Sequence, residues 1–577
     1  FLVGTGVTIG VAGIATFRKG RIDVGDALSN TSIGEGAGDA HTTGSQNIAV
    51  GPSALTENTT GSANVAVGSA ALDVNTTGTD NTAVGNHALG ANVSGTYNVA
   101  VGAEALEANT GGNNTGVGHR ALEANTTGGN NSALGVSALK VNTTGQYNVA
   151  VGGYALDANT TADSNVAVGY NALTENTTGT YNVSVGGYSL DANTTGNYNT
   201  ALGQSALGQN TTADNNTAVG RNALTANTTG TENVAVGALA LDANTTAHQN
   251  TAVGFEALTA NTTGASNVAL GTNALTANTT ASNNTGIGKL ALAANTTGAN
   301  NVAVGALALA ANTTADNNTA VGYLAATNNT TGTRNTSVGR SSLAANTIGS
   351  HQTALGFGAL ANSTTANDNT AVGYEALNAN TTGLQNVGVG CSALAAATGA
   401  HNNVAVGHHA MVATTTGSFN TGVGLLALAA NTTGAQNVAY GYRALASNTT
   451  ASFNTAIGDG CLDTNTTGTN NTAVGSDALA ANTTASNNTA VGKNVLTANT
   501  GAENTALGAS ALGTNTTGAN NVAIGVNALL VNTTGDKNTA VGEFALDANT
   551  TADANCALGY GVLTSNTTGA VNVAIGY

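Results

Sequence analysis

The sequence predicts an all-β fold, a parallel β-solenoid of about 32 stacked rungs that form an elongated rod. One phrase, seen as NTAVGYEALNANTTG at residues 369–383, recurs every 17 residues from Asn30 to the end of the chain. The composition excludes a core of bulky side chains, because only 3% of the 577 residues are aromatic and 78 are glycine. Small residues must therefore pack closely, which suits a stack of short repeats.

The repeat divides the chain into two regions. We number each repeat from its leading Asn, which makes the consensus N-[T/V]-A-V-G-x-x-A-L-x-x-N-T-T-[G/A]-x-x over positions 1 to 17. Residues 30–577 hold 32 full repeats and a stub at 572–577, with single deletions near Asn109 and Asn499. Residues 1–29 are predicted to be an N-terminal β segment that leads into this array.

A single repeat is too short to fold alone. Burying one Val and one Leu contributes about 3–6 kcal/mol, whereas ordering each residue of the backbone costs about 1–2 kcal/mol. Stacked copies can hydrogen-bond one another, and helical repeats need about 33 residues or more, so a β-solenoid is favoured. Because the repeats alternate in type between Asn216 and Arg334, a 34-residue coil is the alternative to one rung per 17 residues.

Two apolar columns are the predicted core. Position 4 is Val, Leu or Ile in every repeat except at Tyr440, and position 9 is Leu in 29 of 32 repeats. In the quoted copy these are Val372 and Leu377, which we expect to point inward. Position 5, Gly373 in this copy, is Gly throughout and predicts a backbone with positive φ or a close approach by another segment.

Position 3 is always Ala, Ser or Gly. If Val372 points inward, Ala371 points outward, because successive strand residues face opposite sides. A column that faces water has no reason to stay this small, so we expect Ala371 to pack against an identical chain around a symmetry axis. A tight interior corner within one chain is the alternative.

The Asn-Thr-Thr phrase at position 12 is an N-glycosylation sequon, and it is intact in 25 repeats. Glycans spaced by about 4.8 Å would crowd one another, whereas asparagines in a turn can hydrogen-bond from rung to rung without any sugar. Both interpretations stay open. The candidate glycosylation residues are Asn58, Asn75, Asn142, Asn159, Asn176, Asn193, Asn380, Asn431 and Asn566.

The remaining residues point away from catalysis and ligand chemistry. The net charge is −17 and no Lys/Arg cluster is present, so nucleic acid is a poor partner. Cys391, Cys461 and Cys556 have neither disulfide nor metal-ligand spacing, and His408 and His409 have no acidic partner at a repeated spacing. No catalytic set, cofactor, metal site or apolar stretch long enough to span a membrane is expected.

Positions 1 to 5, for example at residues 521–525 (NVAIG), resemble the repeats in the heads of YadA-like trimeric autotransporter adhesins. The resemblance implies a left-handed parallel β-roll, a homotrimer and an adhesive surface. The longer phrase with A-L and N-T-T-G resembles repeats of bacteriophage tail fibres, and residues 4–10 and 13–17 resemble the short β-repeats that lead into such fibres. Both imply an extracellular location, on a cell-surface appendage or a virion fibre.

The predicted function is that of a structural, non-catalytic fibre or filament shaft, with glycosylation left open. The alternative is an adhesin head that binds glycans or matrix through variable positions 6, 7, 16 and 17, and a minor alternative is an ice-binding solenoid with threonine ranks. The aromatic residues favouring the adhesin include Tyr147, Tyr154, Tyr181, Tyr188 and Tyr198.

Overall fold

The computed structural model describes residues 26–577, and it is a parallel β-solenoid with one three-residue strand in each 17-residue repeat. The strand occupies positions 2 to 4, and the described residues form no helix. Most of the β segment predicted over residues 1–29 lies outside the described residues, and 26–29 form a turn.

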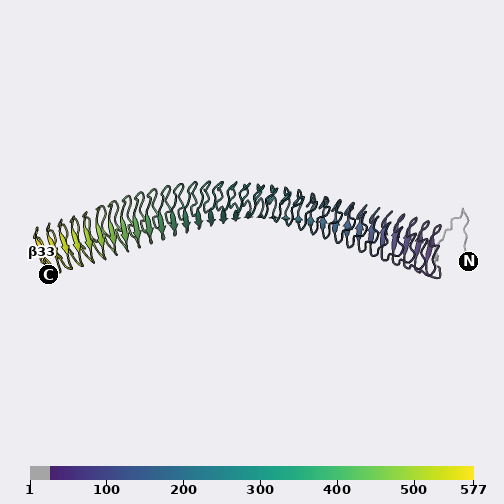
Figure 1. Cartoon of the computed structure of the whole chain (residues 1–577), viewed down its shortest axis with the longest axis horizontal. Coiled ribbons are helices and arrows are strands. Elements are labelled where there is room, and N and C mark those ends of the chain that lie inside the picture. Colours follow the sequence, from purple (N-terminus) through teal and green to yellow (C-terminus); the bar gives the residue numbers. More distant parts are fainter. Residues whose placement is uncertain (1–25) are drawn as a thin grey trace, which may run out of the picture. The chain divides into compact units, whose positions relative to one another are not determined.

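The rungs form two compact units, Phe1–Thr246 and Ala247–Tyr577. Figure 1 shows the strand arrows of successive rungs following one another within each unit. The strands of the first unit are β1 (Thr31–Ile33), β2 (Ile48–Val50), β3 (Val65–Val67), β4 (Thr82–Val84), β5 (Val99–Val101), β6 (Thr115–Val117), β7 (Ser132–Leu134), β8 (Val149–Val151), β9 (Val166–Val168), β10 (Val183–Val185), β11 (Thr200–Leu202), β12 (Thr217–Val219) and β13 (Val234–Val236). Those of the second are β14 (Thr251–Val253), β15 (Val268–Leu270), β16 (Thr285–Ile287), β17 (Val302–Val304), β18 (Thr319–Val321), β19 (Thr336–Val338), β20 (Thr353–Leu355), β21 (Thr370–Val372), β22 (Val387–Val389), β23 (Val404–Val406), β24 (Thr421–Val423), β25 (Val438–Tyr440), β26 (Thr455–Ile457), β27 (Thr472–Val474), β28 (Thr489–Val491), β29 (Thr505–Leu507), β30 (Val522–Ile524), β31 (Thr539–Val541), β32 (Cys556–Leu558) and β33 (Val573–Ile575).

Within each unit, every strand pairs in parallel with the next one along the chain, residue for residue. Ala371 in β21 lies opposite Gly388 in β22, one repeat further on. The same register holds where the repeats alternate in type, since Val302 pairs with Thr319. One coil therefore consumes 17 residues and not 34.

The strand face that points inward is the one that the sequence predicted to point outward. Ala371 has no exposed surface and lies inside its own chain, whereas Val372 is half-exposed on the outside. Leu377 is fully buried, where the sequence placed it. The assignment of Val372 to the core and of Ala371 to an interchain contact is therefore corrected.

The reason is the room left beside the position-9 leucine. Gly388 occupies the Ala371 column one rung on, and a Cβ at Gly388 would lie 3.2 Å from Cγ of Leu377. That space holds a methyl group and little more. The column is small because it forms a tight interior corner of one chain, which was the alternative considered from the sequence.

Two backbone features close each rung. Gly373 has φ +135°, and a Cβ there would collide with the carbonyl group of Gly390 in the next rung, so only glycine fits. Leu377 adopts the left-handed conformation with φ 51°, which costs an L-residue about 1–2 kcal/mol. Full burial of a leucine contributes about 1.5–3 kcal/mol, so burial offsets this strain.

A ladder of buried asparagines at position 12 joins the rungs. The Asn295 side-chain nitrogen donates to Oδ1 of Asn278 in the preceding rung and to the carbonyl oxygen of Gly298, each at 2.9 Å. Oδ1 of Asn295 accepts in turn from Nδ2 of Asn312 at 2.9 Å. The Asn295 amide thus bonds the rung before it, the rung after it and the carbonyl across its own turn.

A second ladder runs through position 1. Oδ1 of Asn403 accepts from the backbone N–H of Asn420 at 2.9 Å, and Nδ2 of Asn420 donates to the carbonyl oxygen of Gly434 at 2.8 Å. Because these side chains are buried, they satisfy backbone groups that would otherwise lie inside the solenoid without a partner.

The exceptions to the two ladders compensate for one another. Gln352 replaces Asn at position 1, and Ser363 replaces Asn at position 12 of the same rung. The longer Gln352 side chain accepts from Oγ of Ser363 at 3.0 Å and donates to Oδ1 of Asn346 at 3.0 Å. In the two shortened repeats, Asn109 and Asn499 donate to a carbonyl two residues on instead of three and still accept from the next asparagine. The bond to the preceding rung is lost there, which leaves Oδ1 of Asn92 and of Asn482 buried without a partner.

The position-12 ladder is interrupted at two adjacent rungs, where Ala397 and Thr414 replace Asn. Oδ1 of Asn380 and Oγ1 of Thr414, on either side of Ala397, are buried without a hydrogen-bond partner. We expect Ala397→Asn to stabilise the protein by about 1–3 kcal/mol, because the new amide can bond both orphaned atoms. The measurement is the free energy of local unfolding from hydrogen exchange at residues 380–420. Ala397→Leu, which adds volume without hydrogen bonds, is the control and should destabilise the same rungs.

Candidate interaction surface

The most extensive functional candidate in the described residues is the outer strand face. We define it as the side chains at positions 2 and 4 of the repeat, which are the first and last residues of each strand. Position 4 carries Val, Leu, Ile or Tyr in every rung, and these side chains are half-exposed or exposed, up to 59% at Tyr440 among the rungs between the chain ends. The most exposed apolar members between the chain ends are Ile48, Val101, Leu134, Val183, Leu202, Val268, Leu270, Val321, Leu355, Val404, Val438, Tyr440, Ile457, Leu507, Ile524 and Leu558. A regular apolar column of this length is unusual on a surface in contact with water.

The outer strand face is locally hollowed in the first unit. Side chains of β6, β7 and β8 line a shallow, mainly apolar depression formed by Val117, Ser132, Leu134 and Val151 together with Thr115. Its walls are mainly aliphatic, Thr115 and Ser132 add two hydroxyl-bearing side chains, and no charged side chain lines it. Such a depression suits an apolar side chain from another protein surface rather than a polar substrate.

Aromatic side chains flank the strands along the sequence. They stand at position 17 of the preceding repeat, shortly before a strand, and at positions 6 and 7, shortly after one. The rings of Tyr181 and Tyr198 stack with centroids 5.2 Å apart, and Tyr170 makes edge contacts with Tyr154 and Tyr188 at 6.0 and 5.6 Å. We call these five residues the tyrosine cluster. Tyr147, which the sequence also indicated as part of an adhesive surface, is exposed but makes no such ring contact within residues 26–577.

The candidate glycosylation residues lie in the buried ladder. Eight of the nine have no exposed surface, and the exception, Asn566, is partly exposed in the last full rung. Nδ2 of Asn142, the atom to which a glycan would be attached, donates to Asn125 at 2.7 Å and to Gly145 at 3.0 Å. Attachment there would have to precede folding of the rung, since the folded rung leaves no path to this nitrogen.

Partly buried aspartates at position 10 form a separate column. Burial raises the pKa of the carboxyl groups of Asp73, Asp157, Asp191 and Asp463 above the ordinary value. Folding disfavours the charged carboxylates, so they lower the stability of the fold at a pH above their raised, folded-state pKa. This destabilisation is relieved as the pH falls through that pKa and the carboxyl groups take up protons. They lie on separate rungs, so they do not form a shared ligand set.

One acidic cluster, Glu104, Glu107 and Glu123, brings carboxylates within 4.8 Å of one another. Nε of Arg120 lies 2.6 Å from Glu104 and 3.9 Å from Glu123, so a cation from the chain itself already occupies this cluster. The hydrogen bond from Arg120 holds the pKa of Glu104 below its usual range. This arrangement is a surface ion-pair network.

The fold and this surface define the chain as a stacked-repeat β-solenoid protein with an apolar strand face. No protein-family model matches the sequence, and the comparison with curated proteins finds no match either. A search of residues 26–577 finds no helix with the length and hydrophobicity required to cross a membrane.

Proposed function

We propose that this chain is a structural, non-catalytic component of an extracellular fibre or filament, and that copies of it associate through the outer strand face. The observation that carries the proposal is the apolar character of position 4, which every rung retains although the side chain does not enter the core. Core packing gives no reason for it, because the interior is filled by positions 3, 8 and 9. Burial against another copy does give one.

The available area is sufficient for a stable contact. A strip as wide as one three-residue strand measures about 10 Å, and each rung adds about 4.8 Å. The twenty strands from β14 to β33 therefore present about 1,000 Å², while a standard interface buries about 800 Å² on each partner. A match between identical columns also suits a symmetric assembly. The resemblance to trimeric adhesin heads supports a trimer and an extracellular location.

The test compares two variants that add the same charge. The first places Glu at four exposed position-4 residues of the second unit, Leu270, Leu355, Ile457 and Leu507. The control places Glu at four exposed position-14 threonines, Thr263, Thr382, Thr450 and Thr467. Sedimentation velocity of the wild type and the control should show the same oligomer. The strand-face variant should associate about 10,000-fold more weakly, from a loss of about 1.5 kcal/mol for each apolar side chain.

A wild type that is monomeric at every accessible concentration would reject assembly through this face, as would equal association of the two variants. Hydrogen exchange of each monomer checks that the rungs remain folded. Electron microscopy of the wild type then gives the width of the assembly, and a width of a single solenoid would also contradict the proposal.

The tyrosine cluster favours the adhesin as the second candidate. Exposed tyrosine rings can stack on sugar rings. This cluster gathers five of them in consecutive rungs, while smaller aromatic contacts lie at Phe357 with Tyr374 and around Tyr560. A monomeric wild type would leave this surface as the stronger candidate.

The ice-binding alternative keeps only one of its two threonine columns, because the exposed hydroxyls are those of position 14. The position-13 hydroxyls are engaged within the solenoid: Oγ1 of Thr381 donates to the carbonyl oxygen of Thr398 in the next rung at 3.1 Å. The same bond is seen from Thr296 to Thr313, also at 3.1 Å. These hydroxyls stabilise the turn and do not form a free rank toward water.

A further inference from the structure

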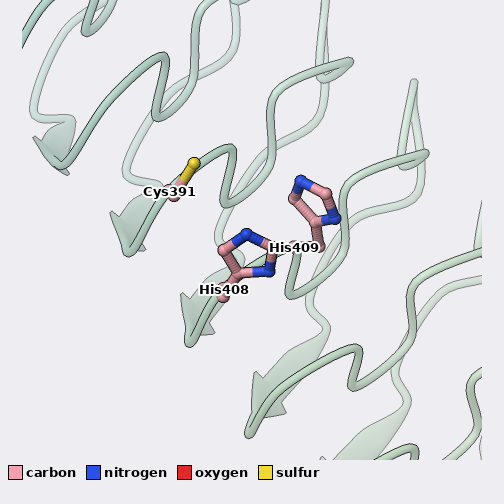
Figure 2. A group of neighbouring side chains, drawn as sticks. All are labelled: Cys391, His408 and His409. Carbon is pink, nitrogen blue, oxygen red and sulfur yellow. The ribbon is translucent and has the colours of Figure 1, made fainter.

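Cys391, His408 and His409 converge on the surface of the second unit. Cys391 follows β22 and His408 follows β23 at the same position of the repeat, so stacking places one directly over the other, and His409 comes next in the chain (Figure 2). One ligand atom from each of the three residues lies within 4.8 Å of the other two. The imidazole centroids of His408 and His409 are 3.9 Å apart.

These three side chains have the chemistry of a transition-metal site. Thiolate sulfur and imidazole nitrogen are the ligands that Zn²⁺ prefers, at about 2.3 and 2.0–2.1 Å. Tetrahedral geometry then requires the ligand atoms to lie about 3.5 Å apart. Because Cys391 and His409 are half-buried and His408 is exposed, small rotamer changes can bring the atoms to that spacing.

The position of the cluster in the stack is the second observation. Cys391 belongs to the rung that contains Ala397, and the two histidines belong to the rung that contains Thr414. These are two consecutive rungs without an asparagine at position 12, and they leave Oγ1 of Thr414 and, in the rung before them, Oδ1 of Asn380 buried without a partner. A metal ion bound by Cys391 and His408 would link the same two rungs from the outside, where the internal link is missing.

We propose that Cys391, His408 and His409 form a metal site that takes Zn²⁺, with a fourth coordination position left to water. Binding deprotonates the Cys391 thiol: the S–H bond breaks, the proton goes to solvent, and the sulfur lone pair forms the bond to the metal. No electron is transferred. The bound ion stabilises the contact between the rungs of β22 and β23.

The residues one rung away do not complete the site from the chain itself. Tyr374 and Glu375 occupy the corresponding positions before Cys391, and Leu425 and Leu426 those after the histidines. The Glu375 carboxylate raises the pKa of the Tyr374 phenol through a hydrogen bond, so this carboxylate is engaged with its neighbour. An open position with three protein ligands is the arrangement found in accessible zinc sites.

The experiment titrates the full chain with Co²⁺ and then Zn²⁺ under reducing conditions. Co²⁺ should bind at one equivalent per chain, with a thiolate charge-transfer band in the near ultraviolet and visible bands typical of tetrahedral Co²⁺, and Zn²⁺ should displace it. C391S should abolish the charge-transfer band, and H408A and H409A should each weaken binding by more than about tenfold.

H119A is the matched control, since His119 stands at the same position of the repeat in the first unit with Ala103 and Val136 in the neighbouring rungs. It should bind Co²⁺ like the wild type. Zn²⁺ should also slow amide exchange in residues 386–419 of the wild type and not of C391S. Absence of saturable binding, or an unchanged Co²⁺ spectrum in C391S, would overturn the proposal. Neither result depends on whether copies associate through the outer strand face.

Discussion

Replacing Asn295 with Asp is expected to lower the local free energy of unfolding by about 3–5 kcal/mol, although the two side chains have nearly the same shape. The Asn295 amide nitrogen donates to Asn278 and to Gly298, and neither acceptor can bond a carboxylate oxygen. The substitution therefore buries a negative charge against two other oxygens. Hydrogen exchange of residues 278–312 and protease cleavage in the same region measure the effect.

Asn300→Asp is the control for this prediction. Asn300 lies in the same rung at position 17, is exposed, and has φ 59°, which Asp tolerates almost as well as Asn. The free energy of unfolding should change by less than about 0.5 kcal/mol. If the two variants are equally stable, the asparagine ladder does not hold the rungs together in the way the structure indicates.

Replacing Leu377 with Asp should also destabilise the solenoid by about 3–5 kcal/mol. Leu377 has no exposed surface and packs against the position-3 column of the next rung at Gly388, so an aspartate there has neither water nor a cationic partner. Amide exchange should accelerate in its own rung and in the two adjoining rungs. Distant rungs should be unaffected, because each rung contacts only its neighbours.

Val372→Asp distinguishes the observed register from the one expected from sequence. The sequence predicted that Val372 and Leu377 both lie in the core, but Val372 is half-exposed on the outer strand face. The monomer should lose about 1 kcal/mol, from the weaker strand propensity of Asp. Equal destabilisation by the two aspartates would show that Val372 points inward after all.

The repeat alone predicted much of the fold. The 17-residue period implied one strand in each rung and parallel pairing between copies, and the invariant position 5 implied a backbone conformation that glycine alone accepts, as seen at Gly373. The asparagine ladder was also one of two interpretations of the Asn-Thr-Thr phrase. These features are visible in sequence because each one recurs at every copy.

The facing of the strand could not be predicted in the same way. Alternation along a strand shows that Ala371 and Val372 point to opposite sides, but it does not show which side is the interior. Larger apolar residues were assigned inward because burial of valine contributes more than burial of alanine. The interior next to Leu377 is too narrow for valine. The distance that sets this limit, from the position-3 column to the leucine of the preceding rung, exists only once the rungs are stacked.

Cys391 and His408 illustrate the same division between sequence and structure. They are 17 residues apart, which matches no familiar spacing of metal ligands, so the sequence indicated no site. Parallel stacking in register converts that separation into direct contact across two rungs. The sequence by itself determined the period, the strand and the turn chemistry, because these are local and repeated. Only the tertiary structure decided which strand face is buried and which single residues meet, because both depend on distances between neighbouring coils.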